Sequence, residues 1–359
     1  MLTLQVPITQ ILYIDFEDDR LQPMNQQGLS QLLDSFYSLY TENHAHTCYL
    51  FLDELQTVKD WPLVIRRFLN TKNVKIYLSG SSAKMLSKEI ATSLRGREIT
   101  VEVWPYSFYE YLEAKGHKKP ENKLSRIEQD KFGSQLRHFL EEGGFPEVTN
   151  KPKVTRTRIL QDYVSVVTYR DIVERHKVEN VTLLDYMIRF LIKNASTPNS
   201  ANKMYNSFKS QGFSVGRETV YDYLKYIEDA FLIFMVPIYS ESIRAQHTTP
   251  NKIYVIDNGL INAFSLKIKD LYHKFLENQV YLDLRRQGKN IFYYNTKDGY
   301  EIDFVTVDKN GERDLIQVTW DMSDPATFER ELRALAQAEE ELGIKGRIIT
   351  SRDYAVKQL

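Results

Sequence analysis

The residues with the clearest chemical potential in this sequence are two adjacent carboxylates, Asp53 and Glu54, which follow the apolar run Cys-Tyr-Leu-Phe-Leu at 48–52. The run predicts a strand buried on both faces, as in a parallel sheet covered by helices. The carboxyl ends of such strands are where ligands bind. An acidic pair there suits Mg²⁺-nucleotide chemistry, in which Asp53 orders the metal's water shell and Glu54 accepts a proton from the attacking water. The alternative is a strand that runs into a helix with an acidic first turn, which favours the helix dipole.

The flanking sequence predicts the elements that would position this pair. Apolar runs indicate strands at 11–16, 74–78 and 99–103, and helices are expected over 28–40 and around 61–69. Strands that alternate with helices are typical of βαβ units and a parallel sheet. The first segment is therefore expected to have an α/β fold.

A second polar group ends the strand at 74–78, where Ser79-Gly80-Ser81-Ser82 follows. A hydroxyl at this position can hydrogen-bond a γ-phosphate or the attacking water, and a serine that caps the next helix is the alternative. Arg97, just before the strand expected at 99–103, offers a guanidinium to phosphate, on its own chain or on another. A solvated arginine is the alternative there.

Several motifs occur in a fixed order and together resemble the prokaryotic AAA-type P-loop ATPases that carry a C-terminal domain of poorly defined function. They are Asp-Phe-Glu-Asp at 15–18, Leu-Asp-Glu-Leu-Gln at 52–56, Trp61, Leu-Ser-Gly-Ser-Ser at 78–82, Leu-Arg-Gly-Arg at 94–97 and Pro-Tyr-Ser-Phe-Tyr-Glu at 105–110. The resemblance implies ATP and Mg²⁺ as cofactors. It places the Walker B role on Asp53, as metal ligand, and on Glu54, as base. It also implies that Ser81 senses the γ-phosphate, that Ser79 and Gly80 line the nucleotide, and that Arg97 stabilises the transition state.

One departure from the family concerns the phosphate loop. The family begins with a strand, a glycine-rich loop and a helix bearing Lys-Thr or Lys-Ser, which supply the amides, the lysine and the metal-binding hydroxyl. No G-x-x-x-x-G-K followed by Ser or Thr occurs in the 359 residues, and the nearest decoy, 212–219, has the wrong spacing and an arginine. We therefore expect an N-terminally truncated form with an incomplete P-loop-type sheet, in which Met1 is an internal start and ATP is bound poorly.

The middle segment, 116–262, is expected to be a helical lid followed by a winged-helix region. Gly-Gly-Phe-Pro-Glu at 143–147 resembles the Gly-x-Pro turn of related signalling ATPases, which implies that Pro146 packs near the nucleotide base; an ordinary helix-to-helix turn is the alternative. Residues 199–237 have a helix-turn-helix pattern with Ser214 as the expected cap of the second helix.

A DNA-reading winged helix would turn one side of that second helix toward the groove. The residues expected there are Arg217, Thr219, Tyr221 and Lys225. Lys203, Lys209 and Lys252 add positive charge nearby, whereas Glu218, Asp222, Glu228 and Asp229 dilute it. Winged helices also serve as lids and protein contacts, so both interpretations stay open.

The last segment, 263–359, is similar to PD-(D/E)xK nucleases, whose carboxylates converge on Mg²⁺ beside a lysine. The resemblance places a degenerate nuclease site on Glu277, Asp303, Gln317 and Thr319, where glutamine replaces an acid and threonine replaces the lysine. We expect this nuclease-like α/β domain to keep its fold without cleavage and to help hold nucleic acid or a partner.

The composition bounds these expectations. Apolar residues make up 42%, charged residues 26% and the net charge is −1, so any nucleic-acid surface must be local. Cys48, the only cysteine, excludes a disulfide within the chain and is expected to be an inert core thiol. No apolar run reaches the roughly 20 residues that span a membrane, and a cytoplasmic protein is expected.

Three domains follow, 1–115, 116–262 and 263–359. The leading hypothesis is an ATPase whose hydrolysis drives domain movement, impaired here by the absent loop. The alternative is a non-enzymatic DNA-binding or protein-interaction module. Self-association and a protein partner are both compatible with the sequence.

Overall fold

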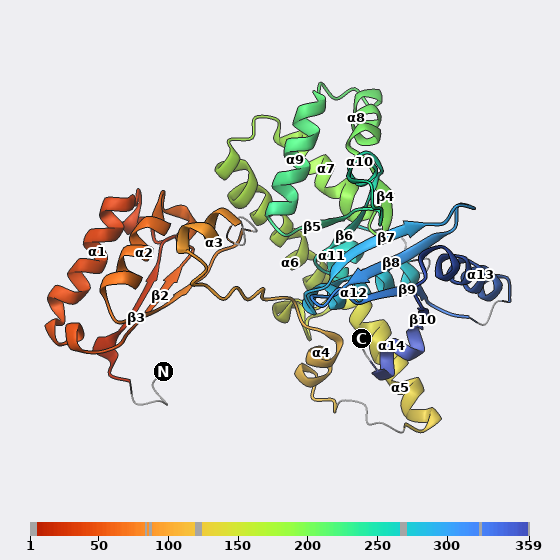
Figure 1. Cartoon of the computed structure of the whole chain (residues 1–359), viewed down its shortest axis with the longest axis horizontal. Coiled ribbons are helices and arrows are strands. Elements are labelled where there is room, and N and C mark those ends of the chain that lie inside the picture. The colour runs from red at the N-terminus through yellow and green to blue at the C-terminus, as the bar shows by residue number, and fades with distance from the viewer. Residues whose placement is uncertain are drawn as a thin grey trace. The chain divides into compact units, whose positions relative to one another are not determined.

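The computed structural model describes residues 6–82, 85, 88–118, 124–265, 271–322 and 325–357. The chain divides into two compact units, Met1–Val101 and Glu102–Leu359 (Figure 1). The first boundary falls before the expected residue 115 because Phe108 and Tyr111 pack into the core of the second unit. The expected middle and last domains lie together in that second unit, since one hydrophobic cluster runs through both.

The first unit is built on a parallel sheet of three strands, β1 (Ile11–Asp15), β2 (Cys48–Asp53) and β3 (Val74–Leu78), in the order β1-β2-β3. The connections hold α1 (Gln26–Leu39) and α2 (Trp61–Thr71), and the short α3 (Lys88–Leu94) follows β3. The register places Asp15 opposite Asp53. The parallel arrangement expected from the sequence is confirmed.

Among the described residues, helices cover only one face of this sheet, so the prediction that β2 is buried on both faces is wrong. Strands added in the order β1-β2-β3 with right-handed crossovers place α1 and α2 on the same face. Cys48, Leu50 and Leu52 are buried beneath these helices. On the other face Phe51 stacks on Tyr77, which is 46% exposed, so aromatic side chains take the positions that alternate with the core.

The strand expected at 99–103 is absent, although every residue of that segment is described. Ile99 and Val103 are 94% and 93% exposed. An alternating apolar pattern forms a strand only where a neighbouring strand supplies hydrogen bonds, and this segment pairs with none of the described strands.

The second unit begins with a helical part. It comprises α4 (Phe108–Ala114), α5 (Arg126–Glu142), α6 (Lys153–Val166), which continues as a π-helical stretch over Val167–Glu174, and α11 (Asn258–Phe264). α5 begins at Arg126. Ser125 and Glu128 form a capping box there, which satisfies backbone donors of the first turn.

The next part follows the order helix, strand, helix, helix, strand, strand. Its elements are α7 (Val181–Lys193), β4 (Thr197–Asn199), α8 (Ala201–Ser210), α9 (Arg217–Asp229), β5 (Ile233–Val236) and β6 (Asn251–Val255), with α10 (Ile243–Thr248) between the last two strands. The strands form an antiparallel sheet in the order β4-β6-β5. Gly216, not Ser214, occupies the N-cap of α9, so the predicted cap is wrong.

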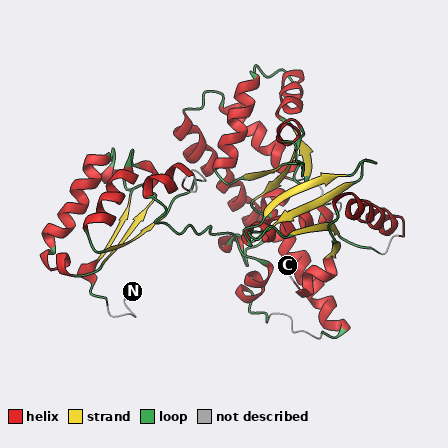
Figure 2. Ribbon diagram, in the orientation of Figure 1, coloured by secondary structure: helices red, strands yellow, loops and turns green. Residues whose placement is uncertain are grey.

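The chain ends in a four-stranded mixed sheet flanked by helices (Figure 2). The elements are α12 (Tyr272–Arg286), β7 (Asn290–Asn295), β8 (Glu301–Val307), β9 (Arg313–Thr319), α13 (Pro325–Leu342), β10 (Gly346–Thr350) and α14 (Ser351–Lys357). β7, β8 and β9 pair antiparallel, and α13 connects β9 to the parallel β10.

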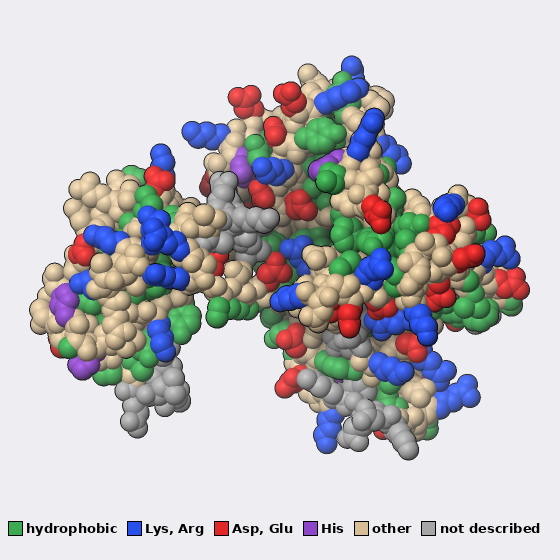
Figure 3. Space-filling model, in the orientation of Figure 1, with side chains coloured by type: hydrophobic (Ala, Val, Ile, Leu, Met, Phe, Trp, Pro, Cys, Tyr) green, Lys and Arg blue, Asp and Glu red, His purple; other side chains and the backbone are tan. Residues whose placement is uncertain are grey.

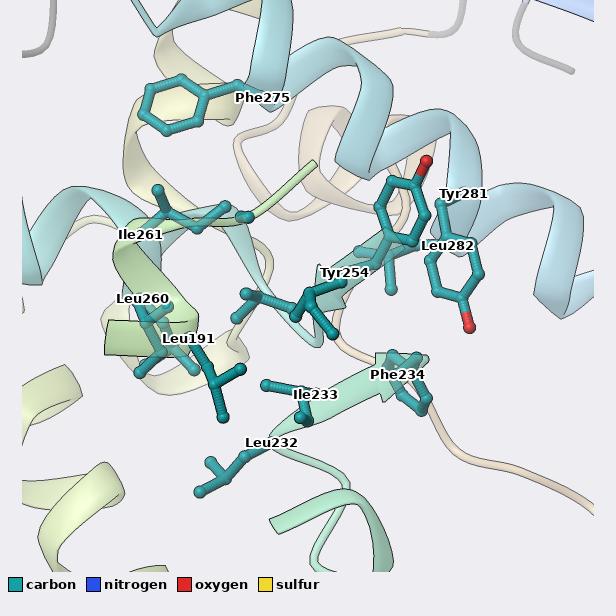
Figure 4. Close-up of a cluster of buried hydrophobic side chains, with 14 of the residues drawn as sticks. Leu191, Leu232, Ile233, Phe234, Tyr254, Leu260, Ile261, Phe275, Tyr281 and Leu282 are labelled. Atoms are coloured by element: carbon teal, nitrogen blue, oxygen red, sulfur yellow. The ribbon is translucent and has the colours of Figure 1, made fainter. Parts of the chain in front are cut away.

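The core of the second unit joins the part that contains β4, β5 and β6 to the four-stranded sheet. Figure 4 shows Tyr254 of β6 beside Tyr281 of α12, and their rings stack 4.3 Å apart. Leu191 of α7 and Phe304 of β8 belong to the same cluster. Across the described residues, no helix has both the length and the apolar character needed to cross a bilayer.

Candidate functional site

The candidate site lies at the carboxyl edge of the three-stranded sheet, where Asp53 is held from both neighbouring strands. Ser79 Oγ, after β3, donates a hydrogen bond to Asp53 Oδ1, and Tyr13 Oη of β1 donates to Asp53 Oδ2 over 3.0 Å. The hydrogen bond to Asp53 raises the pKa of Tyr13. The side chains that the sequence places after neighbouring strands thus meet at one edge.

Glu54 adopts an unusual backbone conformation beside Asp53. Its φ of 52° lies in the left-handed region, which non-glycine residues adopt rarely and mostly where surrounding contacts enforce it. Glu54 N–H donates to Ser79 Oγ over 3.2 Å, so one hydroxyl fixes both acidic residues. Gln56 Nε2 donates to Glu54 Oε2, which holds the second carboxylate in place.

Gly80 and Ser81 lie against the Gln56 amide rather than against Asp53. A Cβ on Gly80 would come within 2.5 Å of Gln56 Oε1, so glycine permits this close approach. Gln56 Nε2 also lies 3.4 Å from Ser81 Oγ. Gln56 Oε1 is buried and accepts no hydrogen bond from a described residue.

The oxygen donors at this edge fit a hard cation of the Mg²⁺ type. Asp15 and Asp53 are register partners, and the Ser79 hydroxyl lies beside Asp53. Mg²⁺ is usually held by one or two carboxylates with waters and substrate phosphates. Among the described residues no three His, Cys, Asp or Glu side chains are grouped to hold a metal alone. The set is therefore suited to a metal shared with a ligand.

The structure does not bring Arg97 to this edge. Its guanidinium donates to Asn70 Oδ1 over 2.5 Å, close to the C-terminal end of α2. Since α2 ends shortly before β3 begins, Asn70 lies at the amino edge of the sheet, opposite Asp53. Pro146 belongs to the second unit, where it is exposed and begins a short turn.

The predicted DNA-facing residues lie along α9, which buries Val220, Leu224 and Ile227. Arg217, Tyr221 and Lys225 are exposed and Thr219 is half-buried. Arg217 and Lys209 both lie over the ring of Tyr205 on α8, at 5.2 and 5.8 Å. Figure 3 shows basic and acidic side chains interspersed on the visible face of this unit.

Two of the four residues assigned to a degenerate nuclease site meet through a residue from another element. The Lys252 ammonium lies 3.0 Å from Glu277 Oε1 and 2.9 Å from Asp303 Oδ1. Gln317 Oε1 instead accepts from Asp303 N–H over 3.1 Å. Thr319 Oγ1 donates to the Asp321 carbonyl over 3.3 Å.

Lys252 was expected to add positive charge near the DNA-reading helix, and this is wrong, because its side chain is only 1% exposed. Asp15, Tyr13 and Gln56 also belong to the site, and no role for them was predicted. Asp15 could have been found, since it follows β1 as Asp53 follows β2. Nothing in the local sequence separates Lys252 from an exposed lysine.

Comparison with known proteins agrees with the α/β fold of the first unit. A family described as AAA domain matches residues 2–112. Two families described as domains of unknown function, DUF8612 and DUF4143, match residues 133–271 and 272–358. The first unit is therefore an AAA-type, ATPase-like domain.

Relatives cover nearly the whole chain. The uncharacterized protein MJ1544 of Methanocaldococcus jannaschii is 36% identical over 356 residues, which cover 97% of this chain and 77% of that protein. An uncharacterized protein of Haemophilus influenzae is 30% identical over 296 residues, covering 82% of this chain and 71% of its own length. The chain belongs to the family of these two proteins.

A solved structure of the Aeropyrum pernix ORC1 protein in complex with DNA is 12% identical and aligns with 73% of this chain and 78% of its own. Its TM-score is 0.31, a likeness too weak to bear on fold or function.

Proposed function

We propose that this chain is an AAA-type ATPase in which Asp53 holds the water shell of a nucleotide-bound Mg²⁺ and Glu54 is the general base. The observation that carries the proposal is the clamp made by Ser79, whose hydroxyl contacts both Asp53 and the Glu54 amide. A carboxylate pair at the end of a parallel strand suits this division of roles.

Ser79 is the better candidate for the sensing hydroxyl than Ser81. Ser79 donates a hydrogen bond directly to Asp53, so a ligand that binds Asp53 would change this hydrogen bond. Ser81 lies 3.4 Å from Gln56, whose own amide bonds Glu54. In the proposed site Gln56 orients the base and Ser81 acts through Gln56, while Gly80 gives that amide room.

When bound, Mg²⁺ would neutralise charge on the phosphates and orient a water. Asp53, with Asp15 beside it, would hold the ion, while Glu54 would accept the proton of the attacking water. Arg97 faces the amino edge in this unit, so a contribution to the transition state requires a neighbouring copy.

The sequence contains no glycine-rich phosphate loop. The residues at the carboxyl edge of the sheet therefore supply contacts only to the metal and to the attacking water. We expect weak Mg²⁺-dependent ATP binding by this chain and slow hydrolysis. Hydrolysis would drive movement of the second unit, proposed to contain a winged-helix region and a nuclease-like domain. The helix and strand order from α7 to β6, and that from α12 to β10, support these assignments.

Nucleotide titration of the full chain tests the proposal. We expect Mg²⁺-dependent binding of ATP that Asp53→Asn abolishes and Glu54→Gln retains, with hydrolysis lost in Glu54→Gln. Lys203→Ala, an exposed position on α8, is the matched control. Binding and hydrolysis unaffected by both acidic variants would contradict the assignment.

A second candidate function is binding of DNA by the α9 face, as a module that acts with or without ATP. The observation in its favour is an exposed row of Arg217, Tyr221 and Lys225 beside the basic side chains stacked on Tyr205. The acidic Glu218 and Asp222 on the same helix are exposed and oppose it. A protein partner on this face is the other use that the exposed row allows.

A further inference from the structure

An open cavity of about 340 Å³ lies in the second unit where its two sheets meet. β5 is the last strand of the sheet β4-β6-β5 and β7 is the last strand of the four-stranded sheet. The two strands touch through a parallel bridge between Ile238 and Tyr293. The residues that precede this bridge line the cavity, and they are Met235 and Val236 of β5 and Asn290 and Ile291 of β7. The cavity therefore opens where the two sheet edges part.

The charged residues that line this cavity are two cations and one acid. Arg285 lies in the last turn of α12, and Lys289 follows that helix by three residues. Glu102 is the acid, and its Oε1 accepts from Arg285 Nη2 over 3.1 Å. The lining thus carries more positive than negative charge, which favours an anionic ligand.

Aromatic rings hold the Arg285 guanidinium in place. Its central carbon lies 4.5 Å from the centroid of the Phe234 ring and 5.5 Å from that of Trp104. Phe234 in turn lies 5.6 Å from Tyr281, and both rings are labelled in Figure 4. A guanidinium stacked on rings keeps its planar set of donors available at its edges. Arg285 is therefore preorganised for an oxyanion.

Arg285 uses only part of its capacity to donate hydrogen bonds. Nη2 donates to Glu102, and Nη1 lies 3.5 Å from Tyr281 Oη. Nε is buried and donates to no described residue. Nε and Nη2 form one edge of the guanidinium, which can pair with two oxygens of a carboxylate or a phosphate. Glu102 thus occupies half of a bidentate position, and the buried Nε lacks an acceptor.

Glu102 is a weakly held occupant of this position. Its side chain is 28% exposed and that of Arg285 is 32% exposed, and ion pairs this accessible to water contribute little to stability. Glu102 is followed by Val103, which is 93% exposed, so little packing holds this part of the chain. An oxyanion that offers two oxygens to Arg285 can therefore displace the Glu102 carboxylate.

The last carbonyls of α12 are bonded within the chain. A free helix C-terminus disfavours a nearby anion, because its carbonyls carry partial negative charge. Here the Arg285 carbonyl accepts from Gly288 N–H over 2.8 Å, and the Leu284 carbonyl accepts from Lys289 N–H over 3.4 Å. These bonds reduce the opposition of the helix end to an anion in the cavity.

We propose that this cavity binds a phosphate monoester, which displaces Glu102 and pairs with Arg285 and Lys289. Two phosphate oxygens accept from Arg285 Nε and Nη2, and a third accepts from the Lys289 ammonium. Two cations match a phosphate monoester, whose charge is about −1.5 to −2, better than a carboxylate. The ligand is small, because the cavity falls at the lower end of the range of about 300–1,000 Å³ for small-molecule sites.

Isothermal titration of the full chain with AMP tests this proposal. AMP carries a phosphate monoester, and EDTA in the buffer removes the metal that the proposed site of the first unit requires. We expect Arg285→Gln to weaken AMP binding at least about tenfold, because a charge-assisted bidentate pair is lost. Lys289→Ala should weaken it several-fold. Glu102→Gln should instead strengthen it several-fold, because the competing carboxylate is gone.

Two controls and two further ligands make the result specific. Glu113→Gln, at an exposed acid of α4, should leave the AMP affinity unchanged, and so should Asp53→Asn in the first unit. Inorganic phosphate and adenosine are titrated separately. Equal affinities for inorganic phosphate and AMP indicate a site for free phosphate, whereas tighter binding of AMP indicates a phosphorylated small molecule. Adenosine that binds as tightly as AMP would overturn the proposal.

Circular dichroism establishes whether each variant folds. If Arg285→Gln does not fold, Lys289→Ala and Glu102→Gln decide the question, because both leave the guanidinium in place. The proposal is also overturned if Glu102→Gln binds neither AMP nor inorganic phosphate. An AMP affinity that is the same in the wild type, Lys289→Ala and Glu102→Gln would overturn it as well.

Discussion

The ammonium of Lys252 lies 2.9 Å from Asp303 Oδ1, a contact between residues 51 positions apart that joins two sheets. Asp303→Ala leaves a buried ammonium short of one partner and also removes the acceptor of the Val318 amide. Loss of one partner of a buried ion pair costs about 3–5 kcal/mol, and we expect a decrease of this size in the free energy of unfolding of the second unit. Urea unfolding followed by circular dichroism measures it.

Glu301→Ala is the matched comparison, because Glu301 contacts the same ammonium from a partly exposed position. Exposed ion pairs contribute about 0–1 kcal/mol, so its effect should be several-fold smaller. Equal effects of the two substitutions would argue against burial as the source of the difference.

The buried carboxyl of Asp257 is expected to make the free energy of unfolding depend on pH. Burial raises the pKa of this carboxyl to about 7, although Gly144 N–H donates to it over 2.5 Å and Gly259 N–H over 2.8 Å. The folded-state pKa lies above the unfolded value, so the contribution of Asp257 is fully present below pH about 4 and is lost as the pH rises through about 7.

Unfolding between these values should release one proton from Asp257, which corresponds to a fall of about 1.4 kcal/mol per pH unit. Urea unfolding of the wild type and of Asp257→Asn at pH 5, 6, 7 and 8 measures the slope. The variant should lose that part of the pH dependence. An identical slope in both proteins would show that Asp257 is ionised in the folded state.

The polar residues at the carboxyl edge of the three-stranded sheet could be predicted from the sequence, because a polar residue follows the apolar run of each strand. Polar side chains after successive parallel strands meet at one edge, so Asp53 and Ser79 could be placed together. The side on which a strand is covered could not be read from hydrophobicity alone. Tyr49 and Phe51 alternate with Cys48 and Leu50, but aromatic residues suit a buried and a half-exposed face alike.

Long-range partners account for most of what the sequence could not reveal. Lys252 resembles an exposed lysine until α12 and β8 bring three acids to it. Residues 99–103 have the composition of a strand but find no neighbouring edge among the described strands. Both outcomes depend on tertiary packing, which overrides local pattern.

Salt dependence would distinguish DNA binding by α9 from a protein-contact role. If Arg217 and Lys225 contact phosphates, the affinity for duplex DNA should fall steeply with salt, and Lys225→Ala should lower the slope of log K against log[salt] by about one. Fluorescence anisotropy from low to moderate salt provides the measurement. Glu228→Gln, a half-buried acid on the same helix, serves as the comparison. If the chain binds no DNA at low salt, the exposed row on α9 is better explained as a contact for a protein partner.

The two serines of the turn after β3 separate the proposed roles at the acidic edge. Ser79→Ala removes a hydrogen bond to a carboxylate and one to the Glu54 amide, so Mg²⁺-dependent hydrolysis should fall about tenfold or more. Ser81→Ala removes a 3.4 Å contact with Gln56, which in the proposed site acts on the base indirectly, and should change the rate several-fold less. The rate of phosphate release at high ATP concentration measures both effects, after the background rate of the Glu54→Gln variant is subtracted. A larger loss in Ser81→Ala than in Ser79→Ala would move the sensing role to Ser81, because the hydroxyl that touches the reacting phosphate must be the more sensitive one.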